Sequence, residues 1–312
     1  MALQEALIDK PALTGAMAVR EAVRKIATSE LSAQVGEIDK GFYPADTMRA
    51  FGKAGAWSTH LTPDSAADLR EAIANMAIIS HTCTSTGFMA WCQDTLGWYV
   101  LNTDNLDLRA RLLPRIGSGQ QLGGTGLSNP MKTFYAIEQL RLKAKRTKGG
   151  YLVRGVLPWV SNLGPDHLFG SICEVEDDGQ RVMFLADCAG PGVTLKACEP
   201  FLGMDGTGTY AVQFRDAFIP DSMVLSHDAM SYVKKVRAGF LLLQFGMAFG
   251  LIRDYIAMMR EVRPALGHIN SYLPEQPEQF EETLGKMEGE IMDLARTPYD
   301  SDIAYWRRII EL

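Results

Sequence analysis

The sequence predicts an α+β protein built from three consecutive parts, which are helical, then all-β, then helical again. Apolar residues recur every three or four positions through residues 1–120. From 121 to 226 the apolar period shortens, and Gly, Thr and Pro become frequent. Helical spacing returns over 227–312. We therefore expect an N-terminal α-helical domain, a central antiparallel β-barrel or sandwich, and a C-terminal α-helical bundle with those boundaries.

The first part is expected to hold four helices and one long buried segment. The buried segment, Thr84–Val100, is rich in Met, Trp, Phe and Tyr. Gly55 and Pro114 are the stop signals for two of the helices. The expected helices are Leu13–Ser32, Thr47–Ala54, Ser65–Ser80 and Asp104–Leu113.

The central part is expected to hold six strands with no helix between them. Gly-containing turns separate several of these strands. Such spacing is typical of an antiparallel barrel or sandwich. The expected strands are Ala136–Ala144, Gly150–Val156, Leu168–Val175, Arg181–Asp187, Val193–Ala197 and Ala211–Ile219.

The last part begins with a long apolar helix, Val236–Val262, which Pro264 is expected to break. A second helix is expected over Gln279–Ala295, and a third from Ser301 onward. The sequence stops at Leu312 inside this third amphipathic segment, with no helix stop signal before it. The predicted bundle is therefore incomplete.

Composition excludes several classes of protein. Hydrophobic residues make up 47% of the chain and charged residues 22%, as in soluble globular proteins. The net charge of −6 argues against a nucleic-acid partner. The five cysteines form no C-x-x-C pair, so no metal site is expected. We find no signal peptide and no membrane span, and we expect a cytoplasmic protein.

The segment Gly155–Gly164 reads as a strand that ends in Trp-Val-Ser-Asn. Taken alone, Trp159 and Ser161 are a buried aromatic residue and a turn serine. The segment resembles, however, the Trp-Ile-Thr-Asn signature of the acyl-CoA dehydrogenase family. The resemblance implies that Trp159 packs on the ring of an FAD cofactor. It also implies that the Ser161 hydroxyl donates toward flavin N5.

About thirty residues earlier, Leu127-Ser128-Asn129-Pro130 resembles the Val-Thr-Glu-Pro loop of that family. The resemblance implies that Ser128 and the Leu127 amide bond the pyrimidine edge of the flavin. The family continues with Gly-x-Gly-Ser-Asp, whereas this chain has Met-Lys-Thr-Phe-Tyr at residues 131–135. Phe134 replaces the Ser, which contacts cofactor and CoA phosphate in the family, and Lys132 is a candidate to compensate electrostatically.

Two arginines complete the resemblance. Arg237 is expected to open the long apolar helix beside the acyl-CoA substrate, where the family has an Arg. The segment Arg263–Gly267 resembles the family's Arg-x-Thr-Phe-Gly, whose residues reach the FAD diphosphate of a neighbouring subunit. A homodimer or homotetramer is therefore implied.

The catalytic base is missing from the match. In the family a Glu removes the α-proton of the acyl-CoA while the β-hydrogen leaves as hydride to flavin N5. One position for that Glu is occupied by Val236, and the other lies beyond Leu312. Either the sequence is a truncated form, or it is a naturally divergent homologue.

Three functions stay open. The first is α,β-desaturation of an acyl-CoA in fatty acid metabolism, with electrons passed to an electron-transfer flavoprotein. The second is a flavin-dependent monooxygenase of the same fold, which needs no Glu base. The third is a non-catalytic, degenerate homologue that pairs with an active one.

Overall fold

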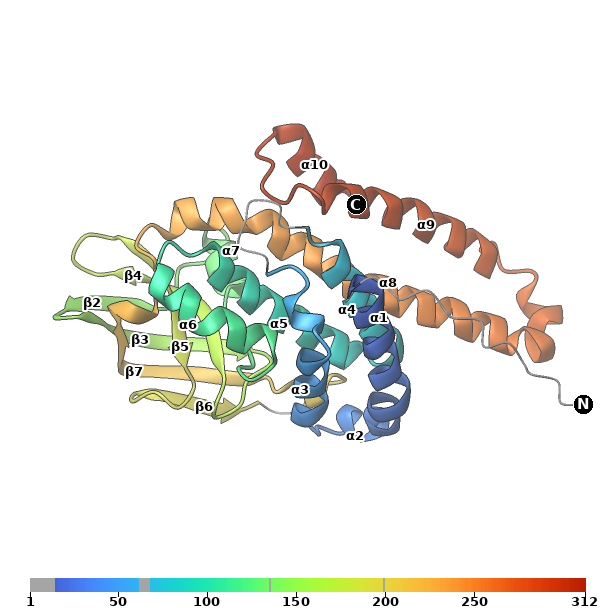
Figure 1. Ribbon diagram of the computed structural model, residues 1–312, viewed down its shortest axis with the longest axis horizontal. Helices are drawn as coiled ribbons and strands as arrows, with labels where there is room; N and C mark the ends of the chain where they lie inside the picture. Colours follow the sequence, from blue (N-terminus) through green and yellow to red (C-terminus); the bar gives the residue numbers. More distant parts are fainter. Residues whose placement is uncertain (1–14, 62–67, 135, 199) are drawn as a thin grey trace, which may run out of the picture.

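The predicted order of elements is confirmed. A computed structural model describes residues 15–61, 68–134, 136–198 and 200–312, and it has N-terminal helices, a central sheet and C-terminal helices (Figure 1). Leu13 and Ser65, where two predicted helices begin, lie outside the described residues. Helices α1 to α6 lie on one side of the sheet, and α8 runs along both parts (Figure 1).

The N-terminal helices follow the predicted pattern with one correction. Pro114 lies inside α6 and does not end it. A proline removes the hydrogen bond to the carbonyl four residues earlier, here that of Ala110. Ala110 is exposed, so water can bond that carbonyl instead. The helices are α1 (Gly15–Ile26), α2 (Val35–Asp39), α3 (Ala45–Lys53), α4 (Arg70–Thr82), α5 (Thr84–Asn102) and α6 (Leu106–Gly117).

Helix α5 is the centre of the helical core. It is apolar on every side and buried along almost its whole length, as the predicted buried segment required. It packs between α4, α6 and α8, where α8 spans Ala229–Asn270. Gly239 of α8 allows close approach to α5, because a Cβ there would lie 2.5 Å from the Trp98 ring. Helix α8 is long and apolar enough to cross a membrane by composition alone, but half of its most apolar window is buried in this packing.

The sheet is mixed, which corrects the antiparallel prediction. Its strand order is β6-β7-β3-β2-β4-β5-β8, and β1 pairs beside β4. Strand β4 runs parallel to both β1 and β2. Strands β2, β3 and β4 alternate in direction, so placing β4 beside β2 forces a parallel pair. The strands are β1 (Gly123–Thr125), β2 (Lys143–Thr147), β3 (Gly150–Val160), β4 (Leu168–Val175), β5 (Arg181–Asp187), β6 (Val193–Ala197), β7 (Tyr210–Pro220) and β8 (Val224–Ser226).

The strand predicted over Ala136–Ala144 is wrong for most of its length, since β2 begins only at Lys143. Asn129, in the short helix α7 (Ser128–Phe134), holds this segment away from the sheet. Its amide donates to the Gln139 carbonyl at 3.0 Å and accepts from the Arg141 amide at 2.9 Å. Backbone groups bonded in this way are not free to pair with a strand.

The C-terminal helices form a hairpin that reaches away from the sheet (Figure 1). Pro264 lies inside α8, so the predicted break is wrong; its bonding partner would be the carbonyl of Arg260, which is exposed. Helices α9 (Pro277–Leu294) and α10 (Ile303–Glu311) follow. Three ion pairs join α8 to α9: Arg253–Glu288, Arg260–Glu281 and Arg263–Glu278.

Candidate active site

A small cavity lies where the end of β3 meets β1, α5 and α8. Its volume is about 360 Å³, which is within the range of sites for small ligands. Its walls are largely aromatic, and three hydroxyl groups face it. The lining residues are Phe88, Trp91, Cys92, Thr125, Ser128, Met131, Trp159, Ser161 and Phe240. The three predicted residues Ser128, Trp159 and Ser161, which come from separate parts of the sequence, thus line one cavity.

Trp159 also lines a second, larger cavity of about 890 Å³. Its side chain is 64% exposed, which contrasts with the buried aromatic residue expected from the sequence pattern alone. The second cavity is almost wholly apolar, and none of its lining side chains carries a charge. Residues of α8 and α10, among them Phe245, Leu251 and Ile309, form much of its wall. Trp159 therefore stands between a small cavity with hydroxyl groups and a large apolar one.

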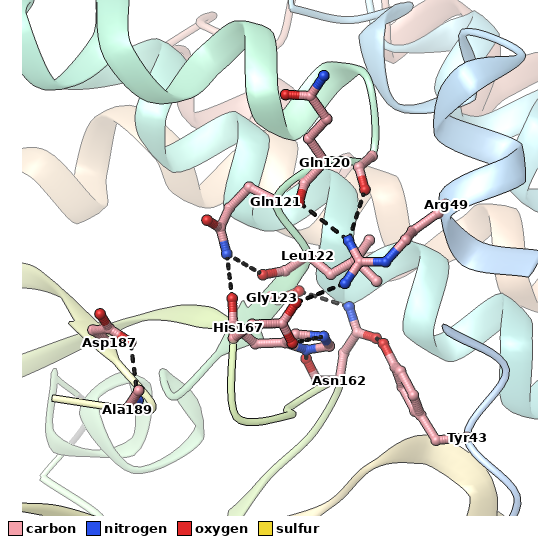
Figure 2. A network of polar contacts seen from close by, with 12 residues as sticks. Tyr43, Arg49, Gln120, Gln121, Leu122, Gly123, Asn162, His167, Asp187 and Ala189 are labelled. Carbon is pink, nitrogen blue, oxygen red and sulfur yellow. Dashed lines mark hydrogen bonds and ion pairs between the residues drawn. The ribbon is translucent and has the colours of Figure 1, made fainter. Parts of the chain in front are cut away.

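Asn162, the last residue of the Trp-Val-Ser-Asn segment, anchors the end of β3. Its backbone is left-handed at φ 60°, a conformation that Asn tolerates better than most residues. Its side chain accepts from the Tyr43 hydroxyl at 2.6 Å and donates to the Gly123 carbonyl at 2.7 Å. Figure 2 shows this junction, where Asn162 lies between Tyr43 and the backbone of β1. The sequence did not reveal this role.

The same junction is closed by a second set of polar contacts around His167 and Arg49 (Figure 2). The His167 ring contacts the Asn162 carbonyl through Nδ1 at 2.9 Å. Burial lowers the pKa of His167, so the ring is neutral at pH 7. Arg49 of α3 pairs with Asp166 at 2.7 Å and donates to the Gln120 carbonyl at 3.1 Å. These bonds fix the loop after β3 against the N-terminal helices.

Leu127 and Ser128 stand at the start of α7. The Leu127 side chain is 1% exposed and belongs to the core, whereas Ser128 faces the small cavity. Asn129, which replaces the family's Glu, binds Glu138 through its amide at 2.9 Å. Lys132 pairs with the same Glu138 at 2.9 Å, so its charge is compensated locally. To compensate for the missing phosphate contact, as the sequence suggested, Lys132 would have to leave this ion pair with Glu138.

The prediction for Arg237 needs correction. Arg237 does not open α8, which begins eight residues earlier at Ala229 with Asp228 as its N-cap. The Asp228 side chain accepts from the Ser231 amide at 3.1 Å, which is the capping signal that sequence reasoning overlooked. The Arg237 guanidinium lies over the Trp306 ring of α10 at 4.0 Å. Within the described residues, Arg237 lines neither of the two cavities.

Val236 and Arg263 are placed apart from the small cavity. Val236 is 1% exposed, and its carbonyl accepts from the Trp98 indole at 2.9 Å. Arg263 stands near the far end of α8 and makes a bidentate pair with Glu278 at 2.8 Å. At about 1.5 Å per helical residue, Arg263 lies far along α8 from Phe240, which lines the cavity. The contact of Arg263 with a neighbouring subunit stays a prediction.

Other cavity residues were not singled out from the sequence. Trp91 lines the small cavity, and its indole donates to the Phe240 carbonyl at 3.2 Å. Thr125 faces the same cavity and shares a 2.8 Å hydrogen bond with the Tyr99 hydroxyl. Cys92 also lines the wall, where burial raises the pKa of its thiol and keeps it protonated.

Comparison with known proteins identifies the fold. The butyryl-CoA dehydrogenase of Megasphaera elsdenii superimposes with a TM-score of 0.73 at 16% identity, covering 94% of this chain and 79% of that one. A glutaryl-CoA dehydrogenase of Mycobacterium smegmatis, solved in complex with FADH2, gives a TM-score of 0.64 at 19% identity. It is matched over 93% of this chain and 76% of its own.

Sequence comparison gives relatives of the same kind. Benzylmalonyl-CoA dehydrogenase of Aromatoleum aromaticum is 26% identical over 152 residues, which are 48% of this chain and 40% of that protein. An acyl-CoA dehydrogenase of Bacillus subtilis is 24% identical over 244 residues, or 74% of this chain and 64% of that protein. The chain therefore spans less than two thirds of these relatives.

The model of the N-terminal domain of acyl-CoA dehydrogenases matches residues 16–120. This match covers the N-terminal helices α1 to α6, of which α5 lines the small cavity. Residues 16–120 thus match the N-terminal domain of the acyl-CoA dehydrogenase family, and the relatives and the fold of the chain agree with that family.

Proposed function

We propose that this protein is an FAD-dependent oxidoreductase that desaturates an acyl-CoA at its α,β bond. The observation that supports it most is the pair of adjoining cavities that share Trp159. The small one offers aromatic walls and hydroxyl groups, which suit a flat ring with polar edges. The large one is apolar and uncharged, which suits an acyl chain.

The residues of the small cavity fit a flavin ring. The Trp159 and Trp91 indoles supply flat apolar faces, and Ser128 and Ser161 supply hydroxyl groups from two different elements. A bound FAD would supply the acceptor for the hydride that leaves the acyl β-carbon. The chain would hold it through Trp159, Ser128, Ser161 and the backbone of Leu127, with Arg263 serving the diphosphate held by a neighbouring subunit.

The base that removes the α-proton is not among the described cavity residues. The lining of the large cavity includes the hydroxyls of Thr84, Thr207 and Thr209 and the Gln244 amide, but no Asp or Glu side chain. None of these groups is a strong base at neutral pH. This observation favours the second candidate, a flavin-dependent monooxygenase of the same fold, for which no carboxylate base is needed. A non-catalytic homologue is the third.

The deciding experiment is a visible spectrum of the purified protein followed by anaerobic titration with a panel of acyl-CoAs. A flavin band that bleaches with one acyl-CoA supports the dehydrogenase. A flavin band that ignores every acyl-CoA, with oxygen-dependent turnover alongside a flavin reductase, supports the monooxygenase. Absence of flavin after reconstitution contradicts both and supports the non-catalytic homologue.

A pair of variants tests the site itself. Trp159→Ala removes one of the two side chains that line both cavities and should raise the Kd for FAD by about tenfold or more. Tyr272→Ala is the matched control, because this exposed aromatic side chain lies in the turn after α8, away from both cavities. Equal FAD affinity in the two variants would contradict the assignment.

We further propose electron-transfer flavoprotein as the redox partner, a homodimer or homotetramer as the assembly, and the cytoplasm as the location.

A further inference from the structure

Three hydroxyl groups run in a chain from the small cavity to a backbone carbonyl. Ser161 Oγ lies 2.7 Å from Thr209 Oγ1, and Thr209 Oγ1 lies 2.8 Å from Thr207 Oγ1. Thr207 Oγ1 in turn donates to the Met204 carbonyl at 2.8 Å. All three distances are those of good O–H···O hydrogen bonds.

The carbonyl at the end of this chain fixes the direction of every bond in it. A carbonyl oxygen can only accept, so the proton of that bond belongs to Thr207. Each hydroxyl carries a single proton, so the bond between Thr207 and Thr209 must use the proton of Thr209. By the same count, the bond between Thr209 and Ser161 must use the proton of Ser161. Three protons serve three bonds, and none remains for the cavity.

We propose that Thr207 and Thr209 are positioning residues that orient the Ser161 hydroxyl, so that Ser161 presents a lone pair rather than its proton to the small cavity. This inference rests on the proposed function, in which that cavity takes a flavin. It reverses the donor role that the family resemblance implied for Ser161.

The orientation matters because the N5 edge of a flavin changes character with its redox state. Oxidised flavin has a lone pair at N5 and needs a donor, whereas reduced flavin carries N5–H and needs an acceptor. An accepting Ser161 suits the reduced form. For Ser161 to donate to the oxidised form, one bond of the hydroxyl chain must be lost. Either way, the chain favours binding of the reduced flavin.

Thr207 is buried, whereas Ser161 and Thr209 are half-buried beside the two cavities. The Thr207 side chain is 2% exposed, so bulk water does not compete for its proton. Thr207 and Thr209 also line the large apolar cavity, whereas Ser161 lines the small one. The hydroxyl chain thus joins the wall of the proposed acyl cavity to the wall of the proposed flavin cavity.

The first test measures the midpoint potential of the bound flavin in Thr209→Val, which keeps the side-chain shape but removes the acceptor of the Ser161 proton. Ser161 can then donate into the cavity, so the ratio of affinities for oxidised and reduced flavin should rise about tenfold. For a two-electron couple this lowers the potential by about 30 mV. Thr207→Val should act in the same direction, because it frees the proton of Thr209 to bond Ser161.

Two controls separate the hydroxyl chain from general disturbance. Thr209→Ser keeps the hydroxyl and should leave the potential unchanged. Thr209→Val in a Ser161→Ala background should produce no further shift, because the group being oriented is absent. A potential that is unchanged, or less negative, in both valine variants would overturn the proposal.

The second test needs no cofactor and so separates this proposal from the proposed function. Neutron diffraction from deuterated crystals of the cofactor-free protein locates the three hydroxyl deuterons. We expect the Ser161 deuteron to point at Thr209 and the Thr209 deuteron to point at Thr207. A Thr209 deuteron that points at Ser161 would overturn the assignment whether or not the protein binds FAD, while absence of FAD alone would defeat only the proposed function.

Discussion

Replacing Asn162 by alanine tests how much the polar junction at the end of β3 stabilises the protein. The side chain is fully buried and makes two hydrogen bonds, to the Tyr43 hydroxyl and to the Gly123 carbonyl. The residue also holds a left-handed backbone at φ 60°. The substitution therefore removes both hydrogen bonds. It also places alanine in a left-handed conformation that alanine tolerates less well than asparagine.

The expected loss can be built from these parts. Each hydrogen bond contributes about 1 kcal/mol net, so the two together contribute about 2 kcal/mol. The left-handed backbone adds about 1 kcal/mol for alanine. The free energy of unfolding should thus fall by about 3 kcal/mol in Asn162→Ala. Asn162→Gly loses the same two bonds, but glycine adopts the left-handed conformation without that cost. Its free energy of unfolding should therefore fall by only about 2 kcal/mol.

The assay is urea denaturation followed by circular dichroism, with the slope of the transition compared among parent and variants. Tyr43→Phe supplies the matched single-bond variant, because it removes the donor to the Asn162 side chain and leaves the backbone unchanged. A loss below about 1 kcal/mol in Asn162→Ala would refute the summed contribution. A glycine variant less stable than the alanine variant would refute the backbone part.

Three further outcomes are expected. Gly239→Ala should lower the free energy of unfolding by about 1–3 kcal/mol, because the added Cβ would lie 2.5 Å from a buried indole atom. Gly285→Ala is the control and should cause no such loss, because nothing lies within 4 Å of its added Cβ. Thermal denaturation of both variants checks this. Burial raises the pKa of Asp94 well above 3.8, so the folded protein binds a proton that the unfolded chain releases, and stability falls as the pH rises above that value. Asp94→Asn should therefore stabilise the protein more at pH 8 than at pH 5 in urea titrations, and an equal gain at both would contradict the reasoning. Arg237→Gln should cost about 1 kcal/mol through loss of its contact with Trp306, and a double-mutant cycle with Trp306→Leu should show coupling rather than additivity.

Local signals were enough to predict the strands that turns enclose. Strands β4, β5 and β6 have the predicted bounds, because Gly-containing turns flank regular apolar patterns there. The pairing of these strands was not predictable from the same signals. The parallel pairs of β4 depend on where the chain returns after β3, which no short pattern encodes.

The errors have physical causes that act over distance. The side chain of Asn129 captures backbone groups ten and twelve residues later, which overrides the strand pattern of the captured segment. Pro114 and Pro264 were read as breaks, yet each helix continues because the carbonyl deprived of its partner belongs to an exposed residue. Propensity describes the isolated chain, and these contacts arise only in the folded one.

The candidate site was predictable only where a motif carried it. Ser128, Trp159 and Ser161 were found through resemblance, and they line one cavity. Thr125 and Thr209 were not found, because a threonine in a Gly-rich turn or strand gives no signal of its own. Their importance comes from which hydroxyl each contacts, and that depends on the packing of β1, β3 and β7.

The packing of α4 and α5 against α8 sets a timing problem for the newly made chain. After Asn102, the end of α5, well over a hundred residues must be added before α8 begins at Ala229. At about 5–20 residues per second, the ribosome needs roughly 6–25 s for this stretch. During that interval the apolar faces of α4 and α5 lack their main covering helix. We therefore expect nascent chains of this protein to engage chaperones before α8 emerges, and slower translation to increase its aggregation.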